Sequence, residues 1–151
     1  MLEFEITETG LIGNEALAME HLNGLRRRGL RIAIDDFGTG YSSFSKISDY
    51  PVDSIKIDQS FVARIGLCAK SESIIKAIVS LTRILACTSV AEGVENEAQE
   101  AFLKAIGCNH FQGYFYYRPL EVAQLRDLGL GGAPTADGAA PALQLAWSLE
   151  P

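Results

Sequence analysis

Stretches with the spacing of strands alternate with stretches of helical spacing, and this alternation limits the fold more than any other feature of the chain. The strand-like stretches are short, apolar or alternating, and we expect them at Leu2–Thr7, Arg31–Asp35, Asp53–Asp58, Thr88–Glu92 and about His110–Gly113. The expected helices run from Asn14 to about Arg28, Ser71 to Ala86, Asn96 to near Ile106 and about Glu121 to Leu128. Strands separated in this way predict a parallel sheet with helical crossovers, an α/β fold.

The composition changes after the last expected helix. Residues 1–128 contain the whole strand and helix pattern, and we expect them to form one domain with a real core. Residues 129–151 are rich in Gly, Ala and Pro, which is typical of a flexible tail. The segment 36–50, which follows the second strand, contains two glycines and four serines and is a candidate loop over a site.

The charge balance excludes some classes of partner. The net charge is −6 and the isoelectric point is near 4.9, so the long-range field repels nucleic acids and anionic membranes. No apolar run is long enough to cross a bilayer. Three scattered cysteines without a close pair suggest reduced, buried thiols. We therefore expect a cytoplasmic domain that binds neither DNA nor RNA, although an upstream segment could tether the parent protein to a membrane.

Acidic and amide side chains gather where the expected strands end. In parallel α/β folds the carboxyl ends of the strands meet and form the ligand site. The polar residues near these ends are Glu5, Asp35, Asp36, Lys56, Asp58, Glu92, Glu95 and Gln112. An Asp-Asp-x-Gly turn alone favours a structural interpretation, because Asp and Gly are common turn residues. Five strand ends with the same character favour a functional site instead.

Charged residues on buried strands need compensation. Both faces of a parallel strand are normally apolar, and an uncompensated buried carboxylate costs several kcal/mol. Adjacent carboxylates such as Asp35 and Asp36 also repel each other unless a positive charge lies between them. Hard oxygen ligands without a Cys or His cluster indicate Mg²⁺ or Mn²⁺ rather than zinc.

Five motifs occur in order along the chain: Glu5-Ile6-Thr7-Glu8, Asp35-Asp36-Phe37-Gly38-Thr39-Gly40-Tyr41-Ser42-Ser43, Pro51-Val52-Asp53 with Lys56-Ile57-Asp58, Ala91-Glu92-Gly93-Val94-Glu95 and Gln112-Gly113-Tyr114. They resemble the motifs of EAL domains, which are bacterial phosphodiesterases of the second messenger cyclic di-GMP. The resemblance covers about Leu2 to Leu128. It implies a TIM-barrel-like (β/α)₈ fold and hydrolysis of cyclic di-GMP to linear pGpG with two divalent ions.

The resemblance also implies roles for individual residues. Glu5, Asp35, Asp36 and Glu92 would be metal ligands, with Asp35 bridging two ions. Lys56 would orient the attacking water or offset phosphate charge, and Glu92 would be a general base or a further ligand. Support of the ligand or of the adjoining loop would come from Glu8, Asp58, Glu95 and Gln112.

The motifs correspond to the last five of eight βα units, so we expect a partial barrel. In the family, a signature Glu-Ala-Leu in the first strand and an Asn in the third strand supply further metal ligands, and neither precedes Glu5 here. The triplet Glu15-Ala16-Leu17 falls within an expected helix and does not replace the signature. Gln59 stands where the family often has Arg. We therefore expect weak or no turnover by the chain alone, with a cyclic di-GMP receptor or a protein-interaction module as the alternative.

A partial barrel leaves two unpaired strand edges, at Leu2–Thr7 and near His110–Gln112. Unpaired edges favour pairing with another chain. We therefore expect self-association through these edges or through the loop 36–50. The cluster Tyr114–Tyr117 is more typical of packing than of base stacking, and His21 and His110 are expected to be surface or packing residues.

Overall fold

The computed structural model describes residues 2–7, 15–38 and 47–119, and these form a parallel sheet with helices. The strands are β1 (Glu3–Thr7), β2 (Arg31–Phe37), β3 (Ser54–Ile57), β4 (Thr88–Ala91) and β5 (His110–Phe111). The helices are α1 (Glu15–Arg27), α3 (Gln59–Val62), α4 (Ala69–Ile84) and α5 (Glu97–Ile106). None of these helices is long and apolar enough to cross a membrane.

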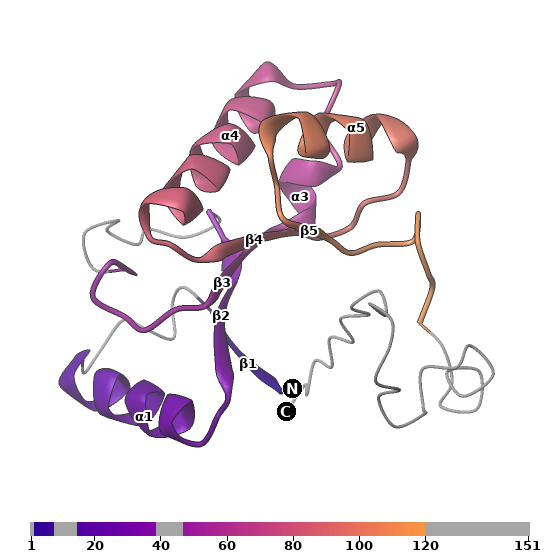
Figure 1. Ribbon diagram of the computed structural model, residues 1–151. Coiled ribbons are helices and arrows are strands. Elements are labelled where there is room, and N and C mark those ends of the chain that lie inside the picture. Colours follow the sequence, from indigo (N-terminus) through magenta and orange to yellow (C-terminus); the bar gives the residue numbers. More distant parts are fainter. Residues whose placement is uncertain (1, 8–14, 39–46, 120–151) are drawn as a thin grey trace, which may run out of the picture. The chain divides into compact units, whose positions relative to one another are not determined.

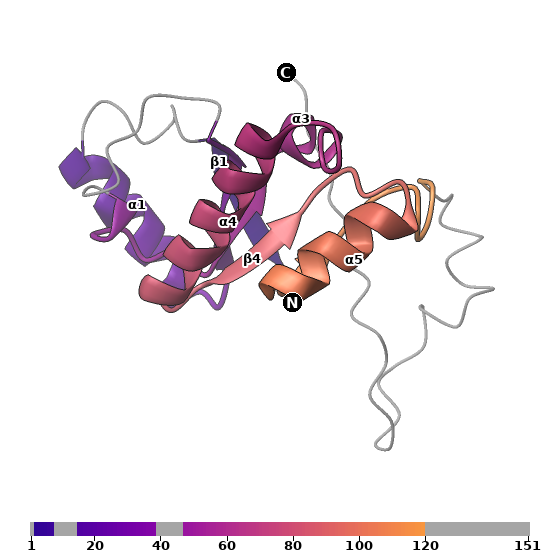
Figure 2. The same ribbon diagram turned by 90° about the horizontal axis from the view of Figure 1, so that it is seen from above.

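The five strands follow one another in chain order, β1-β2-β3-β4-β5, and every neighbouring pair is parallel. The longer helices α1, α4 and α5 lie along one side of the curved sheet, as Figure 1 shows, and Figure 2 gives the same arrangement from above. This is the expected α/β fold, and β1 and β5 are the edges of the sheet as predicted.

The two faces of the sheet differ in polarity because side chains alternate along each strand. The register aligns Ile6 with Ile34 and Ile34 with Ile55, so these side chains share one face, which packs in the hydrophobic core. Helix α4 contributes Ile75, Ile78 and Val79 to the same core. The opposite face carries the charged residues of β1, β2 and β3, which positions them together.

Two features of the structure were not predicted from the sequence. Helix α3 was not predicted, because four residues are too few to produce a helical period. The apolar side of β1 is mostly uncovered: Leu2 is 74% exposed and Phe4 is 45% exposed, and Ile6 packs against the core. The alternation of apolar and polar residues identifies the apolar face of a strand. At a sheet edge it does not show that other side chains cover that face.

The expectation that all three thiols are buried needs correction. All three cysteines are free, but Cys108 alone among them is buried, and Cys68 and Cys87 are partly exposed. Burial raises the pKa of the Cys108 thiol, whereas hydrogen bonds from Ser71 at the start of α4 lower the pKa of Cys68. Residue type did not predict this difference: Leu67, the apolar neighbour of Cys68, is itself exposed.

The predicted ends of α5 are confirmed in detail. The Asn96 side chain accepts a hydrogen bond from the N–H of Gln99 at 3.0 Å and so caps the helix. The Gln99 side chain in turn accepts a hydrogen bond from the N–H of Glu95 at 2.7 Å. At the other end Gly107 has φ 79°, the left-handed conformation that closes the helix. These caps fix the segment between β4 and α5, which carries two of the candidate site residues.

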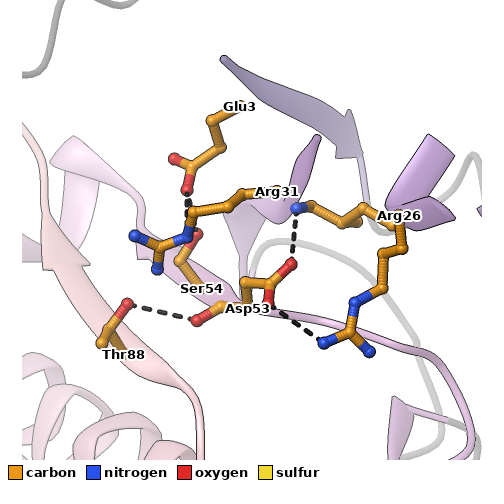
Figure 3. Close-up of polar contacts among 7 residues, drawn as sticks. Glu3, Arg26, Arg31, Asp53, Ser54 and Thr88 are labelled. Atoms are coloured by element: carbon orange, nitrogen blue, oxygen red, sulfur yellow. Dashed lines mark hydrogen bonds and ion pairs between the residues drawn. The ribbon is translucent and has the colours of Figure 1, made fainter. Parts of the chain in front are cut away.

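Hydrogen bonds and ion pairs connect the strands at their amino-terminal ends, opposite the candidate site (Figure 3). Asp53 is at their centre: its carboxylate accepts a hydrogen bond from the N–H of Ile32 at 2.9 Å and pairs with Arg26 at 3.4 Å. The backbone oxygen of Asp53 accepts hydrogen bonds from both the N–H and the hydroxyl of Thr88. Next to it, Ser54 donates a hydrogen bond to Glu3. The network thus joins β2, β3 and β4 around one residue.

Replacing Asp53 by Ala should destabilise the fold. The change leaves the N–H of Ile32, a fully buried residue, without its acceptor, and an unsatisfied buried donor costs about 1–3 kcal/mol. The free energy of unfolding, measured by urea denaturation, should fall by this amount. The matched control is Arg26→Ala, which removes the more exposed partner of the ion pair and should cost about 0–1 kcal/mol. Equal losses in the two variants would contradict a central role for the Asp53 carboxylate.

Candidate functional site

The Lys56 ammonium lies at the centre of the acidic residues that the sequence singled out. Its Nζ is 2.9 Å from Glu5 Oε1, 3.0 Å from Asp35 Oδ1 and 2.8 Å from Glu92 Oε1. The three acids come from β1, from β2 and from the residue after β4, and Lys56 itself is on β3. The carboxyl ends of four strands therefore meet at one side chain, as predicted.

A bulge in β2 brings two neighbouring acids to the same place. Successive side chains of a regular strand point to opposite faces. Between Ile34 and Phe37 the register of β2 against β3 shifts, and Asp36 has φ 52°, a left-handed conformation that Asp tolerates better than most residues. Because of this irregularity, Asp35 and Asp36 can both direct carboxylate oxygens to one site.

Oxygen atoms of Asp35, Asp36 and Glu92 lie within 4.8 Å of one another. The Asp35 Oδ1 atom is buried and accepts no hydrogen bond of good geometry, although Lys56 Nζ is in ion-pair contact with it. Three clustered carboxylates are suited to a hard divalent cation. Glu5 does not belong to this group of three, and it is connected to it through Lys56.

The site carries more negative than positive charge. Burial opposes the protonated form of Lys56, but its ion-pair contacts with the carboxylates of Glu92, Glu5 and Asp35 outweigh this, so the pKa of Lys56 is raised. Burial, with the charges of Asp35 and Glu5, raises the pKa of Glu92 in spite of Lys56. One ammonium cannot neutralise so many carboxylates, and the remaining negative charge attracts cations.

Asp36 shows the same excess of negative charge. Burial first, and then the charges of Asp35 and Asp58 with a hydrogen bond to Asp58, raise the pKa of the Asp36 carboxyl. Asp58 also caps α3, because its Oδ1 accepts a hydrogen bond from the N–H of Ser60 at 2.9 Å. Asp58 thus supports the loop after β3 and lies close enough to Asp36 to influence its charge.

A cavity of about 280 Å³ adjoins the acidic cluster. Its lining comes from the ends of β3, β4 and β5 and consists of Gln59, Glu92, Gly93, Glu95, Gln112, Gly113 and Tyr114. Gln112 is fixed by two backbone hydrogen bonds, from its N–H to Ala91 and from Val94 to its carbonyl. The cavity therefore places amide, carboxylate and aromatic groups beside Glu92.

The structure brings most of the residues expected at the site together. Two further residues, Gln59 and Gly93, were not singled out from the sequence. Glu8 lies outside the described residues. Gln59 lines the cavity although the sequence suggested no role for it, and Gly93 (φ 66°) has no room for a side chain, since a Cβ there would be 2.7 Å from that of Gln59. Gln59 could have been found, because it follows Asp58 at the carboxyl end of β3. The close approach of Gly93 could not.

A parallel sheet with helical crossovers and an acidic cluster at the carboxyl ends of its strands defines an α/β protein of the TIM-barrel-like type. A family model, the EAL domain, matches residues 1–119, and the chain belongs to this family. The resemblance that the motifs indicated is therefore confirmed.

Three similar proteins illustrate the match. The cyclic di-GMP phosphodiesterase RocR of Pseudomonas aeruginosa is 42% identical over 117 residues, covering 78% of this chain and 30% of the relative. The EAL domain of Mycobacterium smegmatis DcpA has a TM-score of 0.79 and 37% identity, covering 87% of this chain and 60% of that structure. The manganese/cy-diGMP complex of Klebsiella pneumoniae BlrP1 has a TM-score of 0.71 and 36% identity, covering 78% of this chain and 30% of that structure.

The chain spans less than a third of the length of the first curated relatives that it matches. It covers 60% or less of the solved chains named above. The match therefore corresponds to a partial EAL domain, as the sequence predicted.

Asp36→Asn should stabilise the protein when divalent cations are removed with a chelator. The change removes a charge repelled by Asp35 and Asp58, and Asn tolerates the left-handed conformation at position 36. Because Asp36 is exposed, the gain at neutral pH should be small, about 0.5 kcal/mol.

The pH dependence of this gain has a definite sign. The folded-state pKa of Asp36 is raised, so the cost of its charge is present above that pKa and disappears as the pH falls below it. Urea denaturation from pH 7 to pH 3 should therefore show the two proteins converging in acid. The control Asp49→Asn changes an exposed Asp outside the cluster, and an equal gain there would contradict the prediction.

Proposed function

We propose that this chain supplies the carboxyl-terminal part of a metal-dependent phosphodiesterase that hydrolyses cyclic di-GMP to linear pGpG. The observation that carries the proposal is the meeting of Asp35, Asp36 and Glu92 around Lys56 at the carboxyl ends of the strands. The relative RocR, named a cyclic di-GMP phosphodiesterase, and the manganese/cy-diGMP complex of BlrP1 support the same assignment.

The cofactor in this proposal is a pair of Mg²⁺ or Mn²⁺ ions. The ligands would be Glu5, Asp35, Asp36 and Glu92, all of them carboxylates, which are the donors that these hard cations prefer. The buried oxygen of Asp35 that accepts no hydrogen bond is the feature that best fits such an ion. When bound, the ions activate water and stabilise the developing charge of the phosphodiester.

The protein groups have two tasks in the reaction. Glu92, whose raised pKa makes it a better proton acceptor than an ordinary carboxylate, takes the proton of the attacking water or serves as a further ligand. Lys56 is held rigidly by three ion pairs and orients the water or offsets phosphate charge. Both side chains are therefore positioned before the substrate arrives.

The cavity beside Glu92 would hold part of the dinucleotide. Gln59, Glu95 and Gln112 offer hydrogen-bond donors and acceptors to a base or a ribose, and Tyr114 offers an aromatic surface. Asp58 would support this region by capping α3. Glu8 would anchor the loop that follows Asp36.

A second candidate function is binding without hydrolysis. It is compatible with the cavity beside Glu92, whose amide, carboxylate and aromatic groups can hold a nucleotide whether or not hydrolysis follows. A receptor for cyclic di-GMP, or a module that binds a protein partner through the open edges of β1 and β5, would need fewer ligands. Self-association through the same edges belongs to this proposal.

The enzyme is tested with the full-length protein that carries this chain. Asp35→Ala removes the carboxylate shared by the metal cluster and the Lys56 ion pair, and production of pGpG should fall by about a thousandfold or more. Turnover is measured by chromatography of cyclic di-GMP and pGpG with Mg²⁺ or Mn²⁺, and a chelator should abolish it reversibly.

The control variant is Asp49→Asn, outside the cluster, which should retain wild-type turnover. Undiminished pGpG production by Asp35→Ala would remove Asp35 from the mechanism. Tight binding of cyclic di-GMP by the wild type without any turnover would support the receptor instead.

Gln59→Ala should weaken substrate binding more than it slows the chemical step. Gln59 lines the cavity and is not one of the ion-pair partners of Lys56, so KM should rise about three- to tenfold while kcat changes less than twofold. Ser60→Ala changes the exposed neighbouring residue, which does not line the cavity, and should leave KM unchanged. A fall in kcat at constant KM would contradict a binding role for Gln59.

A further inference from the structure

Lys56 occupies the position in the acidic cluster that favours a cation. Its Nζ contacts oxygens of Glu5, Asp35 and Glu92 at 2.8 to 3.0 Å. These are three of the four carboxylates that the proposed function assigns to metal ions. The lysine and the metal therefore use the same donor groups.

The ammonium is not a mobile surface charge that could easily move aside. The Lys56 side chain is 4% exposed, and its backbone belongs to β3 between the fully buried residues Ile55 and Ile57. A buried ammonium is stable when carboxylates surround it, as they do here. Without it, no ion pair to another basic residue is recorded for these three carboxylates in the described part of the chain.

We propose that Lys56 is the internal counter-ion of the metal-free site and that it competes with divalent cations for the carboxylate oxygens. The proposal rests on the proposed function, because it takes the same acids as metal ligands. Lys56 keeps the carboxylates converged before the metal binds, and the entering cation displaces the ammonium at least from Asp35, a residue of both the metal cluster and the ion pair. Lys56 thereby lowers and sets the metal affinity of the site.

Two expected effects distinguish a lysine that competes with the metal from a lysine that acts only in the reaction. Removing the ammonium should destabilise the metal-free protein, because the carboxylates then repel one another. It should also strengthen metal binding, because a positive charge that repels the cation and competes for its ligands is gone. A lysine that acted only on the water or the phosphate would change turnover without changing metal affinity in this direction.

The test measures Mn²⁺ and Mg²⁺ binding to the full-length protein by isothermal titration calorimetry, without cyclic di-GMP. In Lys56→Met the dissociation constant for the metal should fall about tenfold or more. Its melting temperature without metal should fall, and the rise in melting temperature on adding metal should exceed that of the wild type. The control is Lys104→Met, because Lys104 pairs with Glu100 on the surface of α5 and is absent from the cluster.

Failure of this inference differs from failure of the proposed function. If the wild type binds metal and Lys56→Met binds it no more tightly, the competition is refuted while the metal-dependent function stands. If neither protein binds metal, the metal-dependent function itself is refuted, together with this inference.

Two further measurements apply if Lys56→Met does not fold. Lys56→Gln keeps a hydrogen-bond donor at the site, and its metal affinity should rise in the same direction. In the wild type, acetylation of Lys56 by acetic anhydride, located by mass spectrometry, should be slow without metal and faster with Mg²⁺, since the displaced ammonium loses its carboxylate partners. Acetylation of Lys104 should not respond to Mg²⁺. Unchanged or slower labelling of Lys56 with Mg²⁺ would overturn the proposal.

Discussion

A buried ammonium among three carboxylates is the interaction on which the site depends. Lys56 connects Glu5, Asp35 and Glu92, so one side chain joins the ends of β1, β2, β3 and β4. A buried charge is costly, and the arrangement is stable because every member has an opposite charge within 3.0 Å. The excess of carboxylates leaves the cluster negative, and this excess makes it suitable for divalent cations.

The two ends of the sheet have separate roles. At the amino-terminal ends of the strands, Asp53 joins β2, β3 and β4 through hydrogen bonds that are satisfied within the protein. At the carboxyl ends, Asp35 retains a buried oxygen that accepts no hydrogen bond. The amino-terminal ends of the strands stabilise the fold, and the carboxyl ends keep groups that can bind a cation. Changes at Asp53 and at Asp35 should therefore affect stability and function differently.

Much of this structure followed from residue types and spacing, and the parts that did not have physical reasons. The parallel order of the strands and the meeting of Asp35, Lys56 and Glu92 followed from periodicity, because carboxyl ends of parallel strands share one edge. The bulge at Asp36 depends on a backbone conformation that several residue types can adopt. The exposure of Phe4 depends on what covers the sheet edge, and the lack of room at Gly93 depends on the close approach of Gln59. Such features arise from three-dimensional packing, which a linear pattern does not contain.

The left-handed backbone at Asp36 has an evolutionary consequence. Every Asp codon becomes an Asn codon by one base substitution, and Asn adopts this conformation as readily as Asp does. Under the proposed function, a single mutation can therefore remove one proposed metal ligand without straining the bulge. Enzymes built on this strand can lose catalysis while they keep their fold and their binding cavity. Proteins that descend from such a mutant could bind the nucleotide without hydrolysing it.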